Sequence, residues 1–184
     1  MKDRVKQAPA RARPRERPPP KDAAGDQPAR PAGEHPSVRP ARRSDVDAVT
    51  AIDAGATGLP KPAYWLELHR RQGAASAARV IFLVATRPEE SERVLGFIVG
   101  EIRAWEFGSE PCGWVYALSV EPGARLHGVA EALLAEIAAQ FRSAGMSKMR
   151  TMVARDNRLP MMFFRSEGMM AGPYIQLEKD LGSP

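Results

Sequence analysis

Residues 121–141, EPGARLHGVAEALLAEIAAQF, join a glycine-containing turn to a regular helix, and this junction narrows the range of folds more than any other stretch. One face of the helix is apolar, because large apolar side chains recur every four residues, at Val129, Leu133, Ile137 and Phe141. Strand-like runs precede the turn (WVYALSV) and follow the helix (KMRTMVA). A strand, a helix and a further strand in this order predict a crossover within one sheet, with the helix packed on a sheet face.

Hydrophobic periodicity over the rest of the chain predicts the element order β-α-α-β-β-β-α-β-α-β. Ser44 is expected to cap the first helix, with Asp47 completing a variant of the capping box. The other expected helices are Lys61–Gln72, Val129 to Gly145 and Leu159–Gly168, and the expected strands are a short one from Val38, Arg79–Thr86, Val94–Trp105, Val115–Val120, Lys148–Ala154 and Tyr174–Leu181. Hairpins followed by crossovers predict a mixed α/β domain with one sheet and helices on its faces.

Residues 1–36 differ in composition from the rest of the chain. They contain nine Lys and Arg, five Asp and Glu and eight of the 17 prolines, and beyond Met1 their one large aliphatic residue is Val5. Such a segment buries too little apolar surface to offset its ordering entropy, so we predict a disordered tail followed by one domain over residues 37–182. Acidic residues interrupt the basic ones and no aromatic side chain is present for base stacking, so nucleic-acid binding is expected to be weak at most.

The cellular location is predicted from two features of the composition. Cys112 is the only cysteine, which excludes an internal disulfide and fits a reducing compartment. We see no secretory apolar segment and no apolar run of membrane-spanning length, so no membrane partner is expected. The cytoplasm is the expected location, and a homodimer is left open.

The turn before the 129–145 helix has the chemistry of an anion site. Unpaired N–H groups and the helix dipole converge at such a helix start. Gly123 and Gly128 have the G-x-x-x-x-G spacing of a phosphate-binding loop, but Val129 and Ala130 follow where that loop needs Lys and Ser or Thr. The dinucleotide pattern GxGxxG is also absent, so neither of these nucleotide sites is supported.

A different motif does match. Arg125 to Ala130, RLHGVA, fits the pattern Gln/Arg-x-x-Gly-x-Gly/Ala, and Asn157, Phe163 and Gly168 fit a second pattern, N-x-x-x-x-x-[FL]-Y-x-x-x-G-F. Both motifs, and the element order over residues 38–181, resemble the GNAT superfamily of N-acyltransferases. The resemblance implies the GNAT fold, a single mixed and mostly antiparallel sheet flanked by helices.

The same resemblance implies acetyl-CoA as co-substrate, and no metal is expected. Backbone N–H groups of His127, Gly128, Val129 and Ala130 would meet its pyrophosphate, with Arg125 nearby. The pantetheine arm would run beside Leu118, Ser119 and Val120, with a main-chain N–H near Leu118 facing the thioester oxygen, and Asn157 would contact the arm.

Proton transfer is the part of the reaction that the motifs leave open. A free lysine amine, with a pKa of about 10.4, is almost wholly protonated at pH 7, so a base or a water path helps, and the leaving thiolate needs an acid. Three positions where relatives carry such groups are apolar here: Phe164, Met152 and Trp114. Tyr116 is the first candidate acid and Glu106 the first candidate base. Weaker candidates are Glu101, Glu67 and His69.

The sequence therefore predicts an N-acetyltransferase that moves acetyl from acetyl-CoA to a primary amine by direct attack in a ternary complex. A protein amine, either lysine or an N-terminus, is the first expected acceptor. A small-molecule amine is the alternative within the same enzyme class. A catalytically weak module that binds acyl-CoA or a partner is the alternative outside it.

Overall fold

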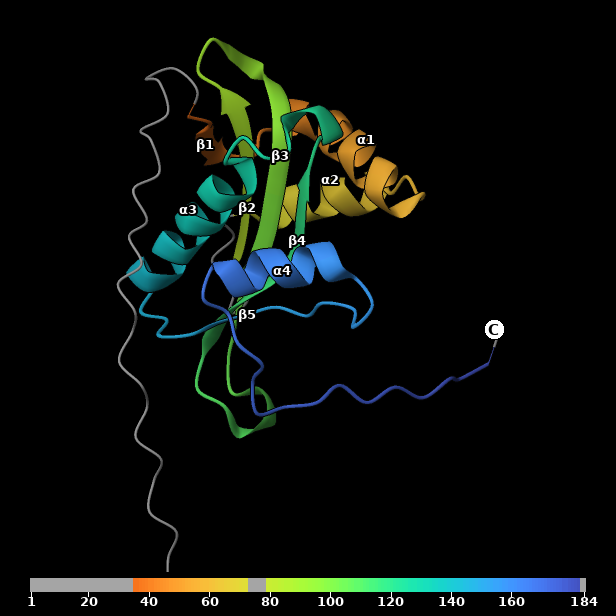
Figure 1. Ribbon diagram of the computed structural model, residues 1–184, viewed down its shortest axis with the longest axis vertical. Coiled ribbons are helices and arrows are strands. Elements are labelled where there is room, and N and C mark those ends of the chain that lie inside the picture. The colour runs from red at the N-terminus through yellow and green to blue at the C-terminus, as the bar shows by residue number, and fades with distance from the viewer. Residues whose placement is uncertain (1–34, 73–78, 183–184) are drawn as a thin grey trace, which may run out of the picture. The chain divides into compact units, whose positions relative to one another are not determined.

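The computed structural model describes residues 35–72 and 79–182, and its framework is one five-stranded sheet (Figure 1). The strands lie in the order β1-β2-β3-β4-β5. The first three pairings are antiparallel and the last, β4 with β5, is parallel. The strands are β1 Ser37–Pro40, β2 Val80–Arg87, β3 Glu90–Arg103, β4 Cys112–Val120 and β5 Met149–Arg150. The predicted mixed, mostly antiparallel sheet is therefore confirmed.

Four helices cover the two faces of the sheet. Helices α1 (Val46–Thr57) and α2 (Pro62–Arg71) pack on one face, and α3 (Val129–Ser143) and α4 (Arg158–Ser166) pack on the other. Strand β2 supplies both cores, because its side chains alternate between the faces. Ile81, Leu83 and Ala85 join the α3 side, while Val80, Phe82 and Val84 join the α1 and α2 side. None of the helices within the described residues is both long enough and apolar enough to cross a membrane.

The start of α1 differs from the prediction. Asp45, and not Ser44, organises the turn before the helix: its carboxylate accepts hydrogen bonds from the Arg42 N–H (2.6 Å) and from two guanidinium nitrogens of Arg39 (2.6 and 3.0 Å). Burial by itself raises the pKa of the Asp45 carboxyl, but these hydrogen bonds outweigh burial and hold the pKa below its usual value. The helix proper then begins at Val46.

Two predicted strands are shorter or missing. The strand expected over 148–154 pairs only at Met149 and Arg150, and the strand expected over 174–181 is not formed. The β5 edge consists of two residues, so it offers almost no ladder on which a further strand could pair. Residues 174–181 instead lie exposed, with the Tyr174 ring 5.1 Å from the Arg150 guanidinium. The predicted tail lies outside the described residues except for residues 35 and 36.

Two glycines of the sheet allow α3 to approach it closely. A Cβ on Gly100 would lie 2.9 Å from the ring of Phe141, and a Cβ on Gly113 would overlap that ring. Phe141 and Ile137 are buried against this surface, so the last turns of α3 are pinned to β3 and β4.

We expect Gly113→Ala to lower the free energy of unfolding by about 1–3 kcal/mol, because the added methyl group overpacks the contact with Phe141. Gly55→Ala is the matched control, since a Cβ there meets nothing within 4 Å and the residue lies inside α1. This control should be stabilised by roughly 0.5–1 kcal/mol. Urea unfolding followed by circular dichroism measures both changes, and equal effects of the two substitutions would contradict the packing account.

Candidate functional site

A cavity of about 420 Å³ lies where β4 and β5 separate. The two strands pair only at Gly113 with Met149 and at Trp114 with Arg150, while β4 continues to Val120. Backbone groups of β4 that point away from β3 beyond Trp114 therefore face no strand among the described residues. The cavity is lined from α1 and α2 by Asp53, Ala56, Thr57, Lys61, Tyr64 and Trp65, from the sheet by Phe97 and Val115–Ser119, and from the segment after β5 by Thr151–Ala154, Asn157, Pro160 and Phe164.

A β-bulge in β4 directs Tyr116 into this cavity. In the β3–β4 ladder Val99 pairs with Ala117 and Gly100 pairs with Val115, so Tyr116 is the extra residue. Its hydroxyl is buried and has no hydrogen-bond partner within the described part of the chain. Burial, together with the nearby Glu101 carboxylate, raises the pKa of the Tyr116 phenol above its ordinary value. The group is thus a neutral donor at pH 7.

Most residues predicted for the pantetheine arm come together at this cavity. Leu118 and Ser119 line it from the open edge of β4, and Asn157 lines it from the start of α4. Val120, the last residue of β4, is half-buried and lies beyond the lining residues. The arrangement leaves main-chain and amide groups along one wall, which suits a ligand that carries amide groups of its own.

The turn after β4 presents an open helix start. Leu126 (φ 65°) and Gly128 (φ 76°) have left-handed backbone conformations, and Gly128 is the N-cap of α3. The first intrahelical hydrogen bond runs from the Ala132 N–H to the Gly128 carbonyl (3.0 Å), so the N–H groups of Val129 and Ala130 have no acceptor within the helix. These are the groups predicted to bind pyrophosphate.

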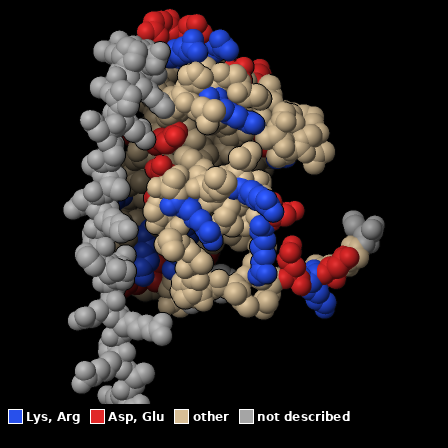
Figure 2. Space-filling view, in the orientation of Figure 1, with Lys and Arg blue, Asp and Glu red and all other residues tan. Residues whose placement is uncertain are grey.

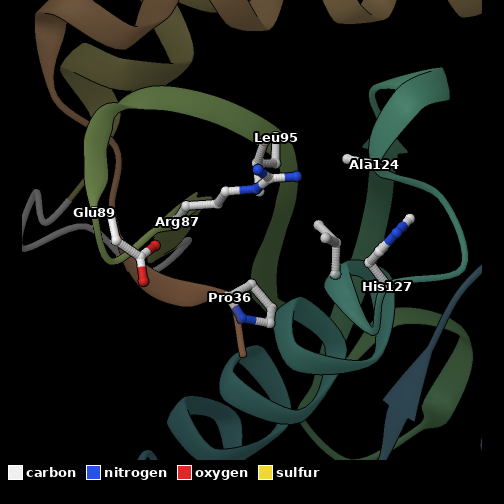
Figure 3. A pocket seen from close by; sticks show the side chains of 7 residues that line it. Pro36, Arg87, Glu89, Leu95, Ala124 and His127 are labelled. Carbon is white, nitrogen blue, oxygen red and sulfur yellow. The ribbon is translucent and has the colours of Figure 1, made fainter. Parts of the chain in front are cut away.

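The two basic side chains of the turn are exposed, and His127 lines a second cavity of about 230 Å³. Nδ1 of His127 lies 2.6 Å from the Arg125 carbonyl oxygen. Figure 3 shows Arg87 reaching from β2 toward Leu95 and Ala124, with His127 on the other side of this smaller cavity. The imidazole therefore does not line the large cavity; it borders the side of the turn that faces the β2–β3 hairpin.

Exposed arginines lie close in sequence to the turn and to α4. Arg125 belongs to the turn, Arg155 precedes α4, and Arg158 and Arg165 belong to α4; all four are exposed. Figure 2 shows Lys and Arg side chains over the middle of the face on which α4 lies, with acidic side chains mainly toward its margins. This distribution favours a phosphorylated ligand on this face.

The remaining candidates for proton transfer do not line either cavity. Glu106 lies in a short 3₁₀ turn (Glu106–Gly108), 3.8 Å from the Arg103 guanidinium. Glu101 is paired with Arg103 (2.8 Å) and with Arg71 (3.7 Å). Glu67 is paired with Arg70 on the exposed side of α2 (3.6 Å), and His69 is half-buried on the same helix. Tyr116 is thus the predicted proton-transfer residue that the fold brings into the cavity.

Asp53 and Lys61 are cavity residues that the sequence analysis missed. Their side chains form an ion pair (2.9 Å), and Trp65 Nε1 donates to the same Asp53 oxygen (3.2 Å). A signal for Asp53 was present: it follows the buried Val46 and Val49 at helical spacing, so a carboxylate occupies the core-facing stripe of α1. A charge in that position marks a cavity or a buried pair.

Comparison with known structures finds the same fold elsewhere. An aminoglycoside N-acetyltransferase, AAC(6')-Iy, in complex with CoA is 16% identical with a TM-score of 0.68, covering 83% of this chain and 99% of that one. AAC(6')-Ih from Acinetobacter baumannii, an aminoglycoside antibiotic 6'-N-acetyltransferase, is 15% identical (TM-score 0.65; 80% and 100%). A transcriptional regulator from Bacillus halodurans is 13% identical (TM-score 0.66; 80% and 100%). Identities this low show the fold alone.

The family follows from the sequence model. No curated protein sequence matches the chain. The model described as "Acetyltransferase (GNAT) family" matches residues 47–166, well over half of the 184 residues, and this span contains both motifs that carried the resemblance except for Gly168. The open edge of β4 and the helix start at Gly128 also provide the groups that an acyl-CoA requires. The chain therefore belongs to the acetyltransferase (GNAT) family of enzymes.

Proposed function

We propose that this protein transfers an acetyl group from acetyl-CoA to a primary amine bound in the cavity between β4 and β5. The observation that carries the proposal is the early end of the β4–β5 ladder, which leaves one edge of β4 open directly beside an anion-binding turn. When bound, acetyl-CoA supplies an activated thioester. Every other requirement falls to side chains and backbone of this chain.

The residues that hold the co-substrate are proposed as follows. N–H groups from His127 to Ala130 bind the pyrophosphate, with Arg125 adding positive charge. Leu118 and Ser119 offer backbone groups to the pantetheine amides, as does the side chain of Asn157. Each of these assignments is supported by an open hydrogen-bonding position or by a place on the cavity wall.

Tyr116 is proposed to act as a hydrogen-bond donor at the reacting centre. A phenol with a raised pKa is a weaker acid than a thiol, whose ordinary pKa is about 8.5, so complete proton transfer to a leaving thiolate is uphill. A neutral donor still stabilises negative charge that develops on oxygen or sulfur. We leave Glu106 out of the proposed mechanism, because its carboxylate does not line the cavity.

A small-molecule amine is the acceptor that we propose. The cavity has a volume within the range of small-ligand sites, and α1 and α2 wall its far end with Asp53, Lys61, Tyr64 and Trp65. Two of the structural neighbours are named for acetylation of aminoglycosides. The sequence-based preference for a protein amine stays a prediction, as do the cytoplasmic location and the homodimer.

Gly128→Val should weaken acetyl-CoA binding by about tenfold or more, ~1.4 kcal/mol, as measured by calorimetry. The left-handed conformation at residue 128 is costly for a β-branched residue, so the turn must rearrange and its N–H groups no longer converge. Gly123→Ala is the control in the same turn, because its added Cβ meets nothing within 4 Å and its φ is not left-handed. Equal affinities of the two variants would contradict the pyrophosphate assignment.

Tyr116→Phe should lower kcat by about tenfold or more while leaving the affinity for acetyl-CoA nearly unchanged. Because burial raises the pKa of this phenol, the wild-type rate should show no loss from Tyr116 ionisation up to about pH 10, the ordinary value. Tyr174→Phe is the control, since that side chain lies outside the cavity. An unchanged kcat in Tyr116→Phe would remove the residue from the mechanism.

Thiol release should be faster with small primary amines than with lysine-containing or N-terminal peptides. A stopped assay with a thiol reagent measures this across a panel of acceptors, with acetyl-CoA hydrolysis as background. If acetyl-CoA binds but no acceptor raises thiol release above background, the protein is a binding module and the proposal fails. If peptides are the better acceptors, the transferase assignment stands and the small-molecule assignment fails.

A further inference from the structure

The end of the large cavity formed by α1 and α2 carries one carboxylate in a particular state. Two donors reach Asp53, the Lys61 ammonium and Trp65 Nε1, and both bind the same oxygen, Oδ2. No donor from the described residues binds Oδ1. The Asp53 side chain is only 10% exposed, so the two contacts fix its position while one acceptor oxygen is left for a ligand.

Lys61 completes a site of two opposite charges. Its side chain is 39% exposed, and its ammonium lies 2.9 Å from Asp53 and 5.8 Å from the centre of the Trp65 ring. An ammonium has three donor hydrogens, so one bond to Asp53 leaves capacity for a further anion. The free Oδ1 and this spare donor capacity lie side by side on one wall.

The charge balance of the cavity argues against a polycation. Asp53 and Lys61 are the only Asp, Glu, Lys or Arg among its described lining residues, so their charges sum to zero. A polyamine or an aminoglycoside would find one carboxylate, already paired, and would be repelled by Lys61. The other surfaces at this end are aromatic: Tyr64, Trp65, Phe97 and Tyr116.

Resting on the proposed function, we infer that the acceptor is a zwitterion, an amine that carries its own carboxylate and an apolar or aromatic side group. Its ammonium binds Asp53 Oδ1 and its carboxylate binds the Lys61 ammonium. On transfer, the nitrogen forms the C–N bond to the acetyl carbon and the thioester C–S bond breaks. The ammonium loses two protons, of which one neutralises the leaving thiolate and the other passes to solvent.

The test compares acceptors that differ by a single group. Phenylalanine, phenethylamine (which lacks the carboxylate) and spermidine are assayed by thiol release with wild type, Lys61→Met, Lys61→Arg and Arg70→Met. Arg70 is the matched control, a cation on the same helix outside the cavity. Wild type should prefer phenylalanine to phenethylamine by about tenfold in kcat/KM.

The variants then separate charge recognition from damage to the fold. Lys61→Met should lower kcat/KM for phenylalanine by about tenfold and leave phenethylamine unchanged or improved, Lys61→Arg should restore the preference, and Arg70→Met should keep it. A wild-type preference for spermidine, or an equal loss for both aromatic acceptors in Lys61→Met, would overturn the inference.

Binding provides a readout that does not depend on turnover. Saturation-transfer NMR in the presence of CoA should detect phenylalanine on wild type and show weaker binding to Lys61→Met. If phenylalanine binds in this Lys61-dependent way but is never acetylated, the proposed function fails while the zwitterion site stands. If acetyl transfer proceeds to other amines and phenylalanine does not bind, the zwitterion site fails alone.

Discussion

The β4–β5 ladder stops after two register pairs, and the candidate site exists because of where it stops. Phe141 packs into the space left by Gly100 and Gly113, which holds α3 against β3 and β4 at the level where β5 pairs. Beyond that level β5 leaves the sheet while β4 continues to Val120. The resulting gap exposes strand edge, and the bulge at Tyr116 directs a hydroxyl into it. A longer β5 would satisfy those backbone groups and close the cavity.

Two ion pairs of the same chemistry have different geometry and consequences. Arg39 binds both oxygens of Asp45, and the Arg42 N–H adds a third donor, so that carboxylate is fully used in joining β1 to the start of α1. Asp53 is held through one oxygen only, on the wall of a cavity. A saturated carboxylate contributes to the fold, whereas one with an open lone pair is available to a ligand.

The sequence allowed the parts set by local periodicity to be predicted, and failed where neighbours decide. The apolar run of β2 and the Val129–Phe141 stripe of α3 follow from side-chain alternation and helical spacing. The strand expected over 174–181 has the right pattern but no long edge beside it, and no local signal reports that absence. Tyr116 was identified from its place on β4, while its bulge depends on pairing with β3. Asp53 was missed because its meaning comes from α2, which supplies Lys61 and Trp65.

The unpaired Tyr116 hydroxyl ties thermal stability to ligand recognition. A buried hydroxyl without an acceptor costs the folded protein free energy, and a ligand that accepts its proton recovers that cost. Laboratory evolution for heat resistance alone would therefore favour phenylalanine at this position, whereas evolution for turnover would retain tyrosine. Comparing the residue recovered at 116 under the two regimes would report directly on which property this side chain serves.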